Sequence, residues 1–139
     1  MSINNVDVVR DLFEKVFAKG DFSTYNDLVD SNVEAHCPPS WSKFHKNEVS
    51  GISNTKKIDE AYQKAFKIIN ATIQDLIAYG DKVTIRWSCH GKHVGDFFEI
   101  SATNKLFDIT GMSIFRLNQG KIVEVWQSWD MFGLLQQLK

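Results

Sequence analysis

The chain lacks an excess of charge of either sign. Its 139 residues carry 16 Lys and Arg against 17 Asp and Glu, a formal net charge of -1. Without a basic stretch, the protein offers no electrostatic attraction for nucleic acid or for an acidic membrane surface. No apolar run is long enough to span a bilayer, and no charged-then-apolar signal segment stands at the start. We therefore expect a cytoplasmic protein that binds neither nucleic acid nor membrane.

Cysteines and metal-binding motifs are also scarce. The two cysteines, Cys37 and Cys89, stand alone in apolar segments, so we expect free thiols. The sequence contains no HExxH, no CxxC and no cluster of ligands with zinc-like spacing. It also contains no glycine-rich phosphate loop and no G-x-S-x-G elbow. These absences predict a site that works without a metal ion, a nucleotide or another cofactor.

Aromatic residues, in contrast, are abundant for a chain of this size. Phe, Trp and Tyr make up 12% of the residues, and four of them are Trp. Aromatic side chains fill cores, but they also line ligand cavities and subunit interfaces. For any single one, the core is the simpler interpretation. Trp41 and Phe44 are exceptions, because aromatics in a polar loop indicate a lid over the mouth of a cavity.

The hydrophobic pattern predicts helices first and strands after them. Apolar residues recur every three or four positions up to about residue 69, and every second position beyond it. This order is typical of an α+β domain, and the glycines at positions 91 and 95 would allow long strands to curl into a cone. The expected helices cover about 6–17, 21–30, 55–69 and 131–137, and the expected extended segments and strands cover 33–37, 73–79, 83–90, 97–100, 106–117 and 122–129. The segment 38–54 is expected to be a loop.

Asp130 is the first candidate for chemistry. It ends a strand rich in large apolar residues, so we expect a partly buried carboxyl group whose pKa is raised towards neutrality. Strand parity places it on one face with Ile122, Glu124 and Trp126. The alternative is that Asp130 caps the final helix through free backbone N–H groups. The two roles are compatible.

Three histidines are further candidates. His93 shares strand parity with Trp87 on the face expected to be buried, where it either contacts a substrate or is a core histidine bonded to a backbone carbonyl. His36 follows an apolar segment, and a structural role is favoured for it. His45 lies in the polar loop and is expected to be solvated.

The whole chain resembles the SnoaL-like polyketide cyclase (ester cyclase) family, within the nuclear-transport-factor-like superfamily. The resemblance rests, in order, on FAKGD, DLVDSNVEAHCP, DLIAYGDKVTIRW, HGKHVG, SATNK, GMSIFRLNQGKIVEVW, Asp130 and LLQQL. It implies a single domain over residues 1–139 with a cystatin-like α+β cone, in which N-terminal helices pack in a strongly curved antiparallel sheet. It also implies a homodimer formed through the outer face of that sheet. The chain departs from the family pattern at Val125, where many members have histidine, and at Lys92, Val94 and Asn104.

The resemblance also implies a reaction, the ring closure of a polyketo ester. Asp130 aligns with the family's general acid/base and would remove a proton next to carbonyl groups, while His93 would hydrogen-bond the developing oxyanion. The same superfamily hosts ketosteroid isomerases and epoxide hydrolases, and a non-catalytic protein that binds a small apolar ligand stays an open alternative. Besides Asp130 and His93, the residues expected to contact such a polyketide-like molecule are His36, Trp41, Phe44, Tyr62, Phe66, Trp87, Phe98, Phe115 and Trp126.

Overall fold

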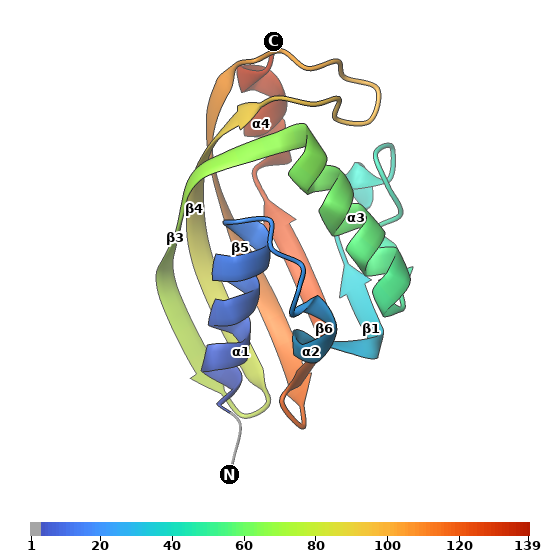
Figure 1. The fold of residues 1–139 in the computed structure, drawn as a ribbon, viewed down its shortest axis with the longest axis vertical. Coiled ribbons are helices and arrows are strands. Elements are labelled where there is room, and N and C mark those ends of the chain that lie inside the picture. Colours follow the sequence, from blue (N-terminus) through green and yellow to red (C-terminus); the bar gives the residue numbers. More distant parts are fainter. Residues whose placement is uncertain (1–3) are drawn as a thin grey trace.

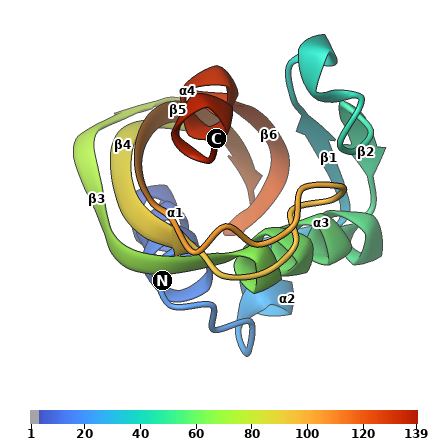
Figure 2. The ribbon, with the colours of Figure 1, turned by 90° about the horizontal axis from the view of Figure 1, so that it is seen from above.

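The computed structural model describes residues 4–139, which build one strongly curved sheet of six strands in the order β2-β1-β6-β5-β4-β3. All neighbouring strands are antiparallel except β1 and β6, which run parallel. Viewed from above, the sheet curls around α4 and leaves the side of α3 open (Figure 2). The strands are β1 (Val29–His36), β2 (Glu48–Ser50), β3 (Phe66–Tyr79), β4 (Lys82–His93), β5 (Leu106–Asn118) and β6 (Lys121–Trp129).

Helices fill the concave face of this sheet and complete the predicted α+β cone (Figure 1). The first helix continues into a wider π-helical turn, and the short η2 turn lies in the loop between β1 and β2. The core lies between these helices and the sheet, around the fully buried Val9, Val83 and Ile122. The helical elements are α1 (Asn5–Asp11), its extension η1 (Leu12–Phe17), α2 (Tyr25–Leu28), η2 (Pro39–Trp41), α3 (Ile52–Ala65) and α4 (Met131–Gln137).

An irregularity in β6 decides which of its side chains face the interior. Ile122 pairs with Leu117 and Glu124 pairs with the preceding Arg116, so Val123 has no partner of its own in the ladder. Such a bulge shifts the alternation of side chains along a strand. Ile122 points inward, but beyond the bulge the odd-numbered residues point inward, as Gln127 does.

Gly111 in β5 allows two tryptophans to pack against the strand. A Cβ atom at this position would lie 2.5 Å from the ring of Trp87 and 2.5 Å from Cβ of Trp129. No side chain can occupy that space without displacing the neighbouring side chains. The glycine thus brings both indoles over the middle of the concave face.

Several predicted boundaries differ from the structure. The final helix is found as predicted, and the last two strands agree to within one residue at each end. The helix expected at 21–30 is shorter because β1 begins at Val29, and the helix expected at 55–69 ends at Ala65 because Phe66 pairs with His93 as β3 begins. The strand expected at 97–100 is wrong, since Phe97 and Ile100 pair only with each other in a turn.

Candidate active site

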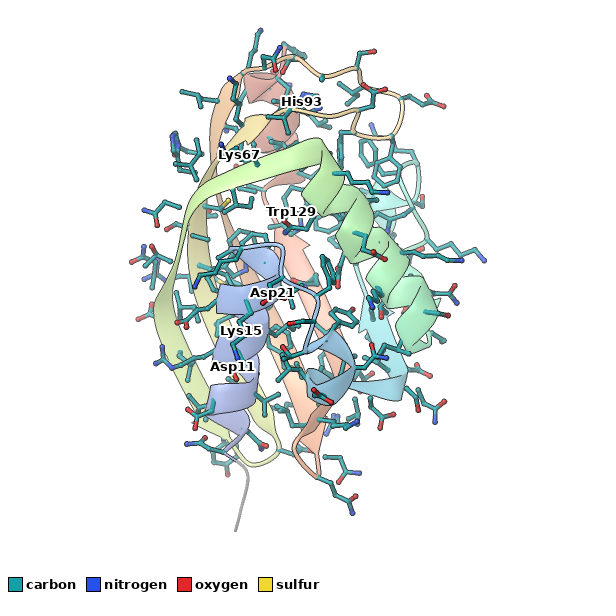
Figure 3. All side chains as sticks on the ribbon, in the orientation of Figure 1. Asp11, Lys15, Asp21, Lys67, His93 and Trp129 are labelled. Carbon is teal, nitrogen blue, oxygen red and sulfur yellow. The ribbon has the colours of Figure 1, made fainter. Side chains whose placement is uncertain are left out.

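An apolar cavity of about 200 Å³ lies between α3 and the concave face of the sheet. Aliphatic and aromatic side chains from η1, α3 and the four strands β1, β4, β5 and β6 form most of its wall. Trp41 and Trp129, whose ring centroids are 4.8 Å apart, belong to the lining. Figure 3 shows Trp129 inside the cone, to the left of α3. The cavity therefore offers a small ligand a mostly apolar surface with few polar groups.

Asp59 is the acid of this cavity. It lies on the inner face of α3, between Thr55 and Tyr62 in the preceding and following turns. The hydroxyl of Tyr25 donates to Asp59 Oδ2 at 2.8 Å and lies 3.2 Å from Thr55 Oγ1. Burial raises the pKa of Asp59 to about 6, although the bond from Tyr25 opposes that rise. A carboxyl group with such a pKa can accept and return protons near neutrality.

A second polar pair, His45 and Tyr62, also belongs to the lining. His45 Nδ1 lies 2.9 Å from the carbonyl oxygen of Lys46, which can only accept, so we place the imidazole proton on Nδ1. Nε2 then accepts from the hydroxyl of Tyr62, 2.9 Å away. Burial raises the pKa of Tyr62, which keeps its hydroxyl protonated. Contrary to the prediction of a merely solvated side chain, His45 takes part in the cavity.

The third polar group of the cavity lies on the sheet. Trp87 Nε1 donates to Ser113 Oγ at 3.2 Å, and Ser113 Oγ donates to Gln127 Oε1 at 2.5 Å. Ser113 is only 2% exposed. The three residues come from the adjacent strands β4, β5 and β6 and form a shielded chain of hydrogen bonds that ends in the carboxamide of Gln127.

The predicted substrate-contacting aromatics divide into two groups. Phe44 and Phe98 do not line the cavity. Both pack against Phe97: the ring centroid of Phe44 lies 5.3 Å from that of Phe97, and the ring centroid of Phe98 lies 5.0 Å from it. Phe98 stands 6.3 Å from Tyr62, so this cluster borders the cavity without facing it. The predicted aromatics that do line the cavity are Trp41, Tyr62, Phe66, Trp87 and Phe115.

His36 and Trp126 lie on the convex face, contrary to the prediction that they contact the ligand. The ring of His36 contacts the carboxylates of Glu48 and Glu124, the latter at 2.7 Å from Nε2. It also stacks on Trp126 with centroids 5.4 Å apart. For Trp126 the parity rule failed because the bulge at Val123 separates Ile122 from the residues that follow. His36 lies outside because it alternates in β1 with Ala35, which lines the cavity.

Asp130 also requires a correction. The expectation of partial burial is wrong: the side chain is exposed and does not line the cavity. Its Oδ1 accepts from the backbone N–H of Gly133 at 2.8 Å, which makes it the N-cap of α4. The acid lies beside His90 and Asp108 in a shallow polar depression. The alternative prediction, a helix cap, is confirmed, and a role for Asp130 in proton transfer stays a prediction.

His93 is fully buried, but it lies outside the cavity lining. Its Nδ1 lies 3.0 Å from Thr103 Oγ1, and its ring packs against Phe66 with centroids 5.3 Å apart. Burial lowers its pKa and favours the neutral ring. Figure 3 shows His93 near the end of the cone where α4 lies, away from Trp129. The position agrees with a core histidine, but its bond has the opposite sense to the one expected: the backbone N–H of Thr103 donates to Nδ1 at 3.2 Å, so this nitrogen accepts rather than donates to a carbonyl.

Sequence reasoning overlooked Asp59 and Gln127. The apolar stripe of α3 was visible, and position 59 lies on it, three residues before Tyr62. A carboxyl group on an otherwise apolar helix face is a usable signal, because burying a charge is unfavourable without a partner. Gln127 alternates with large apolar residues in β6, but its inward direction follows from the bulge, which the sequence does not reveal.

The comparisons with known proteins agree with this architecture. The sequence profile of the SnoaL-like polyketide cyclases matches residues 7–138. The chain belongs to the SnoaL-like polyketide cyclase family. No curated protein sequence matches it at a significant level.

Solved structures similar to this SnoaL-like protein cover nearly the whole chain. Wild-type IdmH from Streptomyces antibioticus, a proposed polyketide cyclase, is 26% identical over 97% of this chain and 98% of its own, with a TM-score of 0.78. A proposed SnoaL-like polyketide cyclase from Jannaschia sp. CCS1 reaches a TM-score of 0.82 at 15% identity, covering 96% and 90%. AclR from Streptomyces galilaeus, a proposed hydroxylase, has 20% identity and a TM-score of 0.78 over 96% and 94%. The last two show likeness of fold alone.

Two further observations concern metals and membranes. Residues 4–139 hold no group of three or more His, Cys, Asp or Glu side chains arranged to bind a metal ion. The same residues form no helix that is both long and apolar enough to span a bilayer.

Proposed function

We propose that this SnoaL-like protein is a cofactor-free acid/base enzyme for a small carbonyl compound, with Asp59 as the proton carrier. The observation that carries the proposal is a carboxyl group in an apolar cavity with a pKa of about 6. At neutral pH most of Asp59 is ionised and can act as a base, yet its conjugate acid forms readily when it takes a proton.

The hydrogen bonds of Asp59 suit this role. Tyr25 holds Oδ2, whereas Oδ1 has no hydrogen-bond donor among residues 4–139. One oxygen is thus fixed and the other is available to a substrate proton. Burial also raises the pKa of Tyr25, so the phenol stays protonated and acts as a holder of the carboxylate.

The reaction that fits the family is the ring closure of a polyketo ester. Asp59 removes a proton from a carbon between two carbonyl groups, and the resulting enolate carbon attacks another carbonyl carbon of the same molecule. A C–C bond forms, and the new alkoxide takes the proton back from Asp59. The protein contributes a folded substrate and a largely dry cavity, which act through proximity and exclusion of water.

The size of the cavity limits the substrate. An engineered cavity of about 150 Å³ in another protein takes up benzene. A cavity of about 200 Å³ therefore accommodates roughly one substituted ring, or an open chain of similar volume. We propose that the substrate is a compact keto ester rather than a molecule with several fused rings.

The test is solvent deuterium incorporation at the acidic carbon of ethyl acetoacetate, a β-keto ester, followed by NMR. We expect the wild-type protein to accelerate exchange and Asp59→Asn to lose at least ~100-fold of that acceleration. The matched control is Asp130→Asn, which keeps a capping side chain and should retain the rate within about threefold.

Full activity of Asp59→Asn would refute the proposal. Loss of activity in Asp130→Asn alone would return the role to Asp130. Saturable binding without accelerated exchange would indicate a binding protein.

We also propose that the convex face mediates a homodimer. Ile77, Ile114 and Trp126 stand in register with Thr84 across four neighbouring strands, and Ile77 is 66% exposed. Met112, next to this row, is 58% exposed. A row of exposed apolar side chains is a favourable subunit contact. Light scattering should give twice the monomer mass for the wild type and the monomer mass for Ile114→Glu. A monomeric wild type would overturn this proposal.

A further inference from the structure

We propose that Gln127 recognises the carbonyl oxygen of the ligand, and that Ser113 and Trp87 are positioning residues which hold its amide N–H groups towards the cavity. This inference rests on the proposed function for one point, that the ligand contains a carbonyl group. It concerns binding and polarisation of that group, and not the transfer of a proton by Asp59.

The direction of the hydrogen bonds determines the orientation of the amide. The indole N–H of Trp87 can only donate, so Ser113 Oγ accepts from it at 3.2 Å. The hydroxyl proton of Ser113 is then directed to Gln127, 2.5 Å away, where only Oε1 can accept. With the amide reversed, Ser113 would receive two donors and its own proton would lack an acceptor in a buried site. Such an unsatisfied group is unfavourable by roughly 1–3 kcal/mol.

The chain leaves the Gln127 Nε2 group available to a ligand. Gln127 lines the cavity, and its Nε2 donates to no acceptor among residues 4–139. An amide NH₂ group facing a mostly apolar cavity is stabilised by any acceptor that enters it. The carbonyl oxygen of a ketone or ester supplies such an acceptor.

The two lining phenols cannot serve the same purpose without breaking existing bonds. Tyr25 already donates its only proton to Asp59, and Tyr62 donates to His45. The helix side of the cavity therefore accepts a proton through Asp59, whereas the sheet side donates through Gln127. A ligand with an acidic C–H and an adjacent C=O matches this arrangement.

The lining also selects for a neutral carbonyl group. None of the lining residues, all within the described part of the chain, is Lys or Arg. A carboxylate ligand would enter without a countercharge and beside the ionised Asp59, which is unfavourable in an apolar site. The ligand class is thus a neutral ketone or ester. As negative charge develops on its oxygen, the N–H groups of Gln127 stabilise it.

The experiment compares two inert ligands of nearly equal shape, acetophenone and α-methylstyrene, which carry C=O and C=CH₂ at the same position. Their dissociation constants are measured by titration calorimetry or NMR for the wild type and for Gln127→Met. We expect the preference for the ketone to fall about fivefold in Gln127→Met, as for the loss of one hydrogen bond. The matched control is Gln63→Met, a second lining glutamine whose Nε2 already donates to the carbonyl of Phe17 at 2.9 Å. Its preference should equal that of the wild type.

The positioning residues are tested with Ser113→Ala and Trp87→Phe, each checked for folding by its thermal transition. Both variants should reduce the preference for the ketone. In the wild type we expect the infrared C=O stretch of bound acetophenone to shift to lower frequency, and both variants should reverse part of that shift. A packing role alone would change affinity for both ligands equally and leave the ratio intact. An unchanged ratio in Gln127→Met would overturn the inference. If Gln127→Met does not fold, the inference would be overturned by a Ser113→Ala variant with an unchanged affinity ratio of the two ligands and an unchanged C=O stretch. Because neither ligand reacts, these results do not depend on whether Asp59 transfers a proton.

Discussion

The two faces of β5 and β6 differ in how their polar groups are satisfied. On the convex face, Arg116 contacts both Asp81 and Glu124, and Glu124 also contacts His36. On the concave face, Ser113 and Gln127 form a single shielded chain, and the amide N–H groups at its end find no acceptor within residues 4–139. Nearby positions of one strand, such as Ser113 and Arg116 in β5, thus belong to two different networks. The hydrogen-bonding groups of the convex network are engaged, whereas the amide N–H groups at the end of the concave one are available.

This difference indicates where chemistry is favourable. Ion pairs in contact with water contribute little energy, and their members are already engaged. A carboxyl group in an apolar cavity, in contrast, has its pKa raised by burial and retains a free oxygen for a ligand. We therefore propose that the chemistry takes place on the concave side, from which the predicted residues His36, Trp126 and Asp130 lie away.

The largest effect on stability is expected from Gly111→Ala on the concave face. Its Cβ would collide with Trp87 and Trp129, so we expect a loss of about 2–3 kcal/mol in the free energy of unfolding. The comparison is Met112→Ala, the next residue, which points to the convex face and is 58% exposed. That change should stay within about 0.5 kcal/mol in the monomer. Equal losses, measured by urea denaturation, would remove the contrast between the faces.

The next effect concerns the stability cost of Asp59, the half-buried acid of the cavity. The folded pKa of Asp59, about 6, lies above its value in an unfolded chain, so the folded state retains a proton that the unfolded state has released between about pH 4 and pH 6. The contribution of Asp59 to the free energy of unfolding should therefore fall as pH rises through this window. Asp59→Asn removes this dependence and should gain on the order of 2 kcal/mol relative to the wild type between pH 4 and pH 8. An equal difference at both pH values would contradict the raised pKa.

A smaller loss is expected when the cap of α4 is removed. Asp130→Ala leaves the backbone N–H of Gly133 without its side-chain acceptor and should reduce the free energy of unfolding by about 1 kcal/mol. Asp130→Asn keeps an acceptor oxygen at the cap, so its free energy of unfolding should fall by only a few tenths of a kcal/mol. Thermal denaturation of the two variants at pH 7 measures the difference. A loss of equal size in both would indicate that the charge, and not the cap, matters.

The smallest effect is expected at His36 on the convex face. Burial alone would lower the pKa of His36, but hydrogen bonds to Glu124 and Glu48 outweigh it and raise the pKa above its ordinary value. The protonated ring therefore contributes stability that is fully present below about pH 6.5 and is lost as pH rises through the higher folded pKa. His36→Gln should lose roughly 0.5–1 kcal/mol at pH 6 and less at pH 9. A loss that grows towards pH 9 would contradict this assignment.

The sequence predicted most of the fold because the relevant signals are local. The twofold alternation of β5 and β6 and the apolar periodicity of α1 placed these elements within a few residues, and the order of motifs indicated the SnoaL-like cone. Asp130 was predicted both as an acid and as a cap. The cap is a contact between residues only three positions apart in the sequence, and this part of the prediction is confirmed.

The sequence alone determined the α+β order of elements, through its periodicity, and the family with its cone, through the resemblance of its motifs. The tertiary structure decided which acid faces the cavity. Asp59 and Gln127 meet one cavity through elements about 70 residues apart, and a bulge at Val123 reverses the parity that had placed Asp130 with the inward Ile122. The pKa of a carboxyl group depends on its burial and its neighbours, and both are fixed only when distant segments pack together.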